Sequence, residues 1–332
     1  MDAFIFGIGC SGTTMIYSLL QSIYSKLYQD DYYSTYEPFI WDKEKFNLPY
    51  EKYIGLFGKI NSISIEGIYN HLNTPMFVDK QSSADYKDSA FFRHFSPTQG
   101  PGQPHLAKFI RANGRMALLR ALNPRARFLL VIRNPVDNIN CVKHKFSFFG
   151  EDFHPSDFPR FCEQLQQEKK LVLNQKNAGW AQRQAEYCYQ MNRVALQFAA
   201  SDKNTRVLEY DSFTQNLQAA VLEVCKFLNT PFSDHYVEGL QRPVGPTTTS
   251  RALSQSEYEA ILRYDNLYSS LCEQSGVRRG KDTNDIRVRY DGKCSSSDLD
   301  TAYEGLTTNR LRNIIRVKDN SIRQLKKLNE SN

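Results

Sequence analysis

The sequence predicts an α/β fold with a mainly parallel central sheet flanked by helices. Two observations support this prediction. Short apolar segments of the kind that form buried strands alternate along the chain with longer segments whose apolar residues recur every three or four positions. The first strand-like segment also runs through a glycine-rich turn directly into a helix-like segment, which is typical of ligand-binding α/β proteins.

Four segments are the expected strands. The first, residues 3–8, is short and apolar and ends at a glycine. The other three are residues 76–79, 127–132 and 206–210. Residues 30–41 are rich in tyrosine and acidic residues, and we expect them to be irregular. Residues 95–104 contain three prolines and two glycines, so they are expected to form a loop.

Helices are expected between these strands. In residues 13–28 the side chains of Ile16, Leu20 and Ile23 fall on one face of a helix, which would pack against the sheet. The same spacing of apolar residues predicts helices over residues 180–200 and 217–228. Helices are also expected over residues 114–122 and, after Pro135 ends the preceding strand, over residues 136–149.

The composition of the chain changes after Gly276. Residues 1–275 are expected to form the main domain, and the polar residues 276–298 a linker. A basic helix is predicted over residues 299–330, with a short heptad pattern that Lys318 interrupts. Such a helix either docks on its own domain or joins copies of the chain into a homo-oligomer, and the sequence leaves both open.

Composition narrows the range of partners. The chain has 332 residues, of which 41% are hydrophobic, and its net charge of +6 is spread along its length. No basic run is interleaved with aromatics, so we expect no nucleic-acid partner, and no apolar run approaches the ~18 residues of a membrane span. Seven scattered cysteines without a C-x-x-C pair, and no leader resembling a signal peptide, predict a reduced cytoplasmic protein without zinc.

The loop FIFGIGCSGTT, residues 4–14, fits three phosphate-binding templates. A dinucleotide site needs a second strand that ends in an acidic residue, but Asp30 and Asp31 follow the first helix with no strand between. A nucleoside triphosphate site needs a lysine where Thr13 stands. The third template, Ser-Gly-Thr-Thr at the start of a helix, requires only backbone N–H groups to hold a phosphate.

A second motif, RFLLVIRNPVDNINCVKHKF, covers residues 127–146. Arg133 stands at the carboxyl end of a predicted strand, where open α/β sheets bind ligands, and its guanidinium can bind a second phosphate. Pro135 and Asp137 then begin a helix, with Asp137 predicted as its N-cap.

Together the two motifs resemble those of the sulfotransferases that use 3′-phosphoadenosine 5′-phosphosulfate (PAPS) and release its desulfated form, PAP. The first motif is similar to their 5′-phosphosulfate loop, and the second to their 3′-phosphate segment. Residues 206–213 and 227–232 are similar to a third landmark, so the resemblance covers residues 3–232. It implies a P-loop-like sulfotransferase architecture and transfer of a sulfuryl group from PAPS to a hydroxyl or amine of a small-molecule acceptor, without a metal.

The resemblance assigns cofactor binding to ten residues. They are Gly9, Cys10, Ser11, Gly12, Thr13, Thr14, Arg133, Cys141, Tyr210 and Arg251. Two of them depart from the family pattern: Cys10 stands where relatives have Lys or Arg, and Cys141 where they have a serine. A thiol donates only a weak hydrogen bond. Tyr210, at the end of the fourth predicted strand, is expected to contact adenine.

The resemblance also suggests two catalytic residues. Lys80 matches a lysine that relatives carry near the sulfuryl group, and Glu37 follows the first helix as the base does in glutamate-using members. His94 and His105 are the alternative bases. Carboxylates and aromatic rings interleave in residues 29–44, which suits a cationic metabolite as acceptor. Two other functions remain open: a nucleotide-binding module without transfer activity, and a P-loop kinase.

Overall fold

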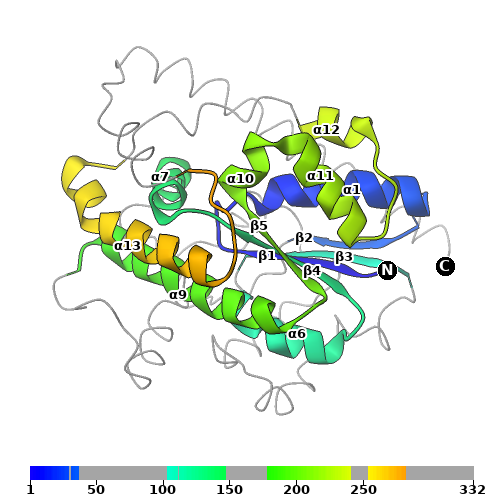
Figure 1. Ribbon diagram of the computed structural model, residues 1–332, viewed down its shortest axis with the longest axis horizontal. Helices are drawn as coiled ribbons and strands as arrows, with labels where there is room; N and C mark the ends of the chain where they lie inside the picture. The colour runs from blue at the N-terminus through cyan, green and yellow to red at the C-terminus, as the bar shows by residue number, and fades with distance from the viewer. Residues whose placement is uncertain (30, 37–102, 111, 147–177, 241–252, 282–332) are drawn as a thin grey trace, which may run out of the picture.

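Five parallel strands form the centre of the protein (Figure 1). The structure is a computed structural model, and it describes residues 1–29, 31–36, 103–110, 112–146, 178–240 and 253–281. The strands are β1 Ala3–Gly7, β2 Tyr33–Tyr36, β3 His105–Phe109, β4 Arg127–Ile132 and β5 Thr205–Glu209. They lie in the order β2-β3-β1-β4-β5, and each neighbouring pair is parallel. The predicted α/β fold with a mainly parallel sheet is confirmed.

Helices cover both faces of this sheet (Figure 1). In chain order they are α1 Thr13–Tyr28, α6 Met116–Leu122, α7 Pro135–Phe146, α9 Trp180–Ser201, α10 Tyr210–Gln215, α11 Leu217–Phe227, α12 Asp234–Leu240 and α13 Gln255–Gln274. A 3₁₀ turn, Asn113–Arg115, precedes α6. Helices α1, α11 and α12 pack on one face of the sheet, and α6, α9 and α13 on the other.

The central strand β1 shows how one short segment supports both layers. All five of its residues are buried. Ala3 and Ile5 point into the layer of α1, whereas Phe4 and Phe6 point into the layer of α9 and α13. This alternation is the period of two that a strand imposes on its side chains. Because β1 lies between β3 and β4, the loop that follows it opens at the carboxyl edge of the sheet, where α/β proteins bind ligands.

Two strands were not predicted from the sequence. Strand β2 lies within the segment expected to be irregular, and β3 follows directly on the expected loop at 95–104. The predicted strand at 76–79 lies outside the described residues. Strand β5 ends at Glu209, because Tyr210 already begins α10, so Tyr210 is a helix residue rather than the last residue of a strand.

The chain continues in contact with the domain beyond α13. Residues 276–281, the start of the predicted linker, include Val277, which packs against the core beneath α9 and α13. The remainder of that linker and the predicted helix at 299–330 lie outside the described residues. Within the described part of the chain, no helix has the length and apolar character needed to cross a membrane.

Candidate phosphate-binding site

The loop between β1 and α1, residues 8–12, is here called the phosphate loop after the motif that it resembles, and its backbone lies in close contact with its surroundings. Gly12 has φ +101°, a left-handed conformation that glycine adopts without steric cost. A Cβ atom at Gly12 would overlap the ring of Tyr210, which lies against the loop. A Cβ atom at Gly7 would come within 2.5 Å of the Ser11 Oγ atom. Both glycines are therefore required by close packing within and around this loop.

Helix α1 begins at Thr13 without a side-chain cap, since Gly12 occupies the capping position. The first turn of a helix presents N–H groups that have no partner within the helix, and the helix dipole adds positive potential there. Together these features make the residues from Ser11 to Thr14 suited to binding an anionic group.

Two buried polar atoms near this loop have no hydrogen-bond partner among the described residues. They are the Ser11 Oγ atom and the Arg133 Nε atom. Arg133 is only 4% exposed, and Ser11 is fully buried. A buried polar group without a partner costs about 1–3 kcal/mol. Two such atoms, one on each of the two predicted motifs, fit a ligand that carries two anionic groups.

Arg133 is fixed by contacts on both sides. Its Nη1 atom donates to the carbonyl oxygen of Cys10 at 3.1 Å, and its guanidinium lies 4.6 Å from the centre of the Tyr210 ring. Burial acts to lower the pKa of Arg133, but the neighbouring Cys141 and Tyr210 groups and other nearby groups together raise it. Arg133 therefore stays cationic at the edge of the phosphate loop.

Asn134, not Asp137, caps α7. The side-chain oxygen of Asn134 accepts the backbone N–H of Asp137 at 2.8 Å. The prediction that Asp137 is the N-cap was therefore wrong by three positions. One turn further on, the Asn138 side chain donates to the carbonyl oxygen of Gly9 at 2.8 Å, which ties α7 directly to the phosphate loop.

Lys108 is a candidate functional residue that sequence reasoning missed. It lies in β3, is only 1% exposed, and its Nζ atom donates to the Thr14 Oγ1 atom at 2.9 Å. The parallel pairing sets Lys108 opposite Tyr36, the last residue of β2. The signal in the sequence was a lysine inside the short segment HLAKF, but such a residue is more often solvated than buried.

The other predicted residues divide into two groups. Glu37, Lys80, His94 and Arg251 lie outside the described residues. Cys141 is buried on α7, and Cys10 is partly exposed in the loop.

His105 is described, but it stands at the amino end of β3, opposite to the phosphate loop. Its ring packs edge-on against Phe4 at 5.4 Å on the face away from α1. This position does not support His105 as the base. Among the described residues, no cluster of three His, Cys, Asp or Glu could hold a metal ion.

Comparison with known proteins identifies the family. Residues 2–234 match the model of a family described as the sulfotransferase family. The chain belongs to this family. No curated protein matches this sulfotransferase.

Comparison with solved structures finds several similar proteins. A sulfotransferase from Alicyclobacillus acidocaldarius is 16% identical, with 83% of this chain and 96% of the other covered and a TM-score of 0.44. The sulfotransferase domain from the curacin biosynthetic pathway is 15% identical, with 84% and 98% covered and a TM-score of 0.43. A mouse sulfotransferase complexed with PAP is 12% identical, with 83% and 84% covered and a TM-score of 0.40.

Proposed function

We propose that this sulfotransferase transfers the sulfuryl group of PAPS to a hydroxyl or amine of a small acceptor. The observation that carries the proposal is a pair of buried atoms, Ser11 Oγ and Arg133 Nε, that have no hydrogen-bond partner in the part of the chain that the structure describes. They belong to the two motifs that resemble the 5′-phosphosulfate and 3′-phosphate segments of PAPS-dependent enzymes. A donor with phosphate groups at both positions would satisfy both atoms.

On the 5′ side, the backbone N–H groups of residues 12–14 bind the phosphate of the donor together with the Ser11 hydroxyl, because the Ser11 N–H already donates to the carbonyl oxygen of Ile8 at 3.1 Å. Negative charge develops on the bridging oxygen as the bond to sulfur lengthens, so a cation is needed there. Lys108 is suited to this role, since its ammonium group already contacts Thr14 in the first turn of α1. The same role for Lys80, which the sequence suggested, stays a prediction.

On the 3′ side, Arg133 binds the second phosphate, with Cys141 beside it on α7. The ring of Tyr210 lies against both Gly12 and Arg133, so it offers an aromatic face between the two motifs. Contact between this ring and adenine stays a prediction, as does binding of the 3′-phosphate by Arg251 as a second ligand.

The acceptor is expected on the side of β2. Glu37 follows Tyr36 directly in the sequence, and Tyr36 pairs with Lys108 across β2 and β3. We therefore retain Glu37 as the base that deprotonates the acceptor. The aromatic and acidic composition of residues 29–44 favours a cationic small molecule, through ion pairs and cation–π contacts.

Calorimetry and a transfer assay test the proposed function. The protein is expected to bind PAP without magnesium and to transfer a labelled sulfuryl group from PAPS to one member of a panel of small cationic alcohols and amines. Binding of PAP without any transfer would favour a nucleotide-binding module. Binding of ATP that depends on magnesium, with no binding of PAP, would favour a kinase and overturn the proposal.

Arg133 gives the first prediction. Arg133→Ala is expected to weaken binding of PAP by well over tenfold, because loss of one partner from a buried charged pair costs about 2–5 kcal/mol. Binding of 5′-AMP, which lacks the 3′-phosphate, should change little. Arg127→Ala is the matched control, since Arg127 stands at the opposite end of β4 and donates to Asn204. Equal losses for PAP and 5′-AMP would mean that Arg133 is structural.

Cys141 gives the second prediction. Cys141→Ser is expected to preserve or tighten binding of PAP, because a hydroxyl is a better hydrogen-bond donor than a thiol. The two side chains are close in size, so the buried position on α7 can accept either. Calorimetry with PAP measures the effect, with thermal unfolding as the check on the fold. Loss of binding in a folded variant would show that Cys141 does not occupy the phosphate-binding position.

A further inference from the structure

Two adjacent contacts join the start of α10 to the segment before α7. In one, the guanidinium of Arg133 lies over the ring of Tyr210 at 4.6 Å. In the other, the Asn134 Nδ2 atom donates to the Asp211 Oδ2 atom at 2.8 Å. Arg133 directly precedes Asn134 in the chain, and Tyr210 directly precedes Asp211. The hydrogen bond between Asn134 and Asp211 therefore fixes the backbone from which the side chains of Arg133 and Tyr210 extend.

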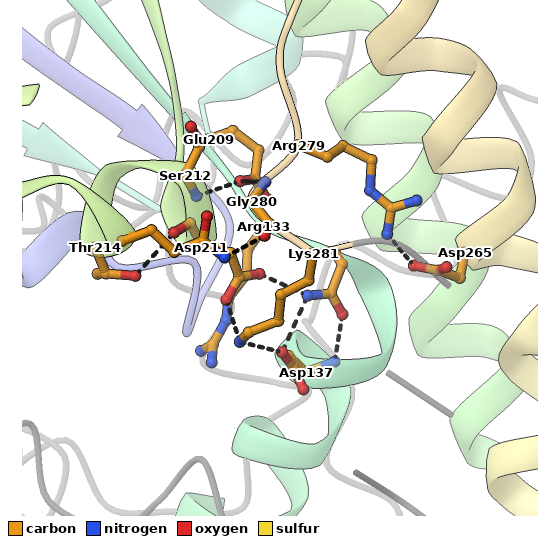
Figure 2. Close-up of polar contacts among 12 residues, drawn as sticks. Arg133, Asp137, Glu209, Asp211, Ser212, Thr214, Asp265, Arg279, Gly280 and Lys281 are labelled. Atoms are coloured by element: carbon orange, nitrogen blue, oxygen red, sulfur yellow. Dashed lines mark hydrogen bonds and ion pairs between the residues drawn. The ribbon is translucent and has the colours of Figure 1, made fainter. Parts of the chain in front are cut away.

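A buried group of charges surrounds the second contact. Asp137 and Asp211 are each almost fully buried, and the side chain of Asn134 donates to both of them. The Lys281 Nζ atom lies 2.5 Å from the Asp211 Oδ1 atom and 3.4 Å from the Asp137 Oδ2 atom (Figure 2). Lys281 thus places one positive charge against two carboxylates that would otherwise repel each other.

Residues 279–281, here called the strap, hold Lys281 in place. Arg279 donates to the fully buried Asp265 of α13 at 2.9 Å. The backbone N–H of Gly280 donates to the Glu209 Oε2 atom at 3.0 Å. Gly280 lies so close to the backbone of α10 that a Cβ atom there would overlap it. Each residue of the strap is therefore held by contacts with the rest of the domain.

Glu209 adds to the negative charge beneath the strap. Burial raises the pKa of Glu209, and the neighbouring Asp211 carboxylate raises it further. The backbone N–H groups of Ser212 and Gly280 act in the opposite direction by donating to it. Three carboxylates thus lie in this region, so the cation at Lys281 is important for holding α10 and α7 together.

We propose that Lys281 is a positioning residue for the nucleotide site. By binding Asp137 and Asp211 it holds Asn134 in place, and through Asn134 it sets the position of Arg133 and Tyr210. The inference rests on the proposed function, because it assigns Arg133 to the 3′-phosphate. It also places a determinant of ligand binding beyond residue 234, where the family match ends.

The first experiment removes the charge of Lys281. Lys281→Met keeps the length of the side chain and is expected to weaken binding of PAP about tenfold or more, since buried charge pairs are strongly coupled. Binding of 5′-AMP should change less, because it lacks the 3′-phosphate. Lys226→Met is the matched control, since Lys226 also contacts a carboxylate, Glu223, but on the exposed surface. Binding of PAP by Lys281→Met that equals the native protein's would overturn the inference.

A charge-rescue variant separates positioning from general loss of stability. Asp211→Asn, combined with Lys281→Met, removes one negative charge along with the positive one and keeps an acceptor for Asn134. The double variant is expected to recover most of the lost affinity for PAP. If it binds no better than Lys281→Met alone, the charge balance of the group is not what positions Arg133, and the inference fails.

Amide hydrogen exchange, measured on the unliganded protein, tests the role of the strap without relying on the proposed function. Lys281→Met should speed exchange in residues 133–140 and 209–215, and the double variant should restore protection, whereas Lys226→Met should do neither. If the native protein binds no PAP, the proposed function fails, and exchange alone decides whether the strap positions these segments. Unchanged exchange in Lys281→Met would refute the strap's role whatever the ligand is.

Discussion

Lys108→Met is expected to lower kcat by about 10²–10³-fold, the usual cost of losing one donor that stabilises charge in a transition state. Methionine keeps the length and the apolar part of the side chain, so it suits a position that is fully buried between β2 and β1. The loss should fall mainly on kcat, because the proposed contacts between the backbone N–H groups of the loop and the donor do not involve the Lys108 side chain. Transfer of labelled sulfuryl groups, measured with calorimetry of PAP, separates the two effects.

Lys80→Met is the matched comparison, because Lys80 is the lysine that the sequence suggested for the same role. If Lys80→Met loses activity and Lys108→Met does not, the role belongs to Lys80. Lys203→Met, at an exposed position far along the chain, controls for the change in net charge. Normal turnover in Lys108→Met would show that its contact with Thr14 is purely structural.

The strands that the sequence predicted share one property. Strands β1 and β4 consist almost entirely of apolar residues and are buried on both faces by helices, and β5 contains the apolar pair Val207 and Leu208. Such runs can be recognised as strands from the sequence alone, without knowledge of the strands beside them. Strand β2, with the sequence Tyr-Ser-Thr-Tyr, lies at the edge of the sheet and has no apolar run. Its identity as a strand depends on pairing with β3, which is a tertiary interaction.

The residues of the candidate site also divide into those that the sequence predicted and those that it did not. The phosphate loop and Arg133 were predictable because each lies within a few residues of an apolar strand, and local sequence fixes their place at the edge of the sheet. Lys108 was not predictable from the sequence, because its contact with Thr14 depends on β3 lying next to β1. The strap was missed for the same reason. Residues 279–281 are polar and resemble a linker until Asp265, Glu209 and Asp211 are brought around them.

Glu37→Gln should have the other large effect. General base catalysis contributes about 10²–10⁴-fold, so kcat is expected to fall by that factor while binding of PAP is unchanged. The reason lies in the position of Glu37 along the chain: it directly follows the end of β2, whose last residue pairs with Lys108. A carboxylate there is suited to accept the proton of an acceptor that approaches the sulfuryl group from the side of β2.

The control for this prediction is Glu44→Gln, which removes a second carboxylate of the same segment, residues 29–44. If the acidic residues act only by attracting a cationic acceptor, both variants should raise KM by similar factors and leave kcat near the native value. If Glu37 is the base, only Glu37→Gln should lose kcat. A small carboxylate such as formate, added to Glu37→Ala, should then restore part of the turnover, because it can accept the proton in place of the missing side chain. Normal turnover in Glu37→Gln would refute the assignment of Glu37 as the base and favour His94, the alternative base.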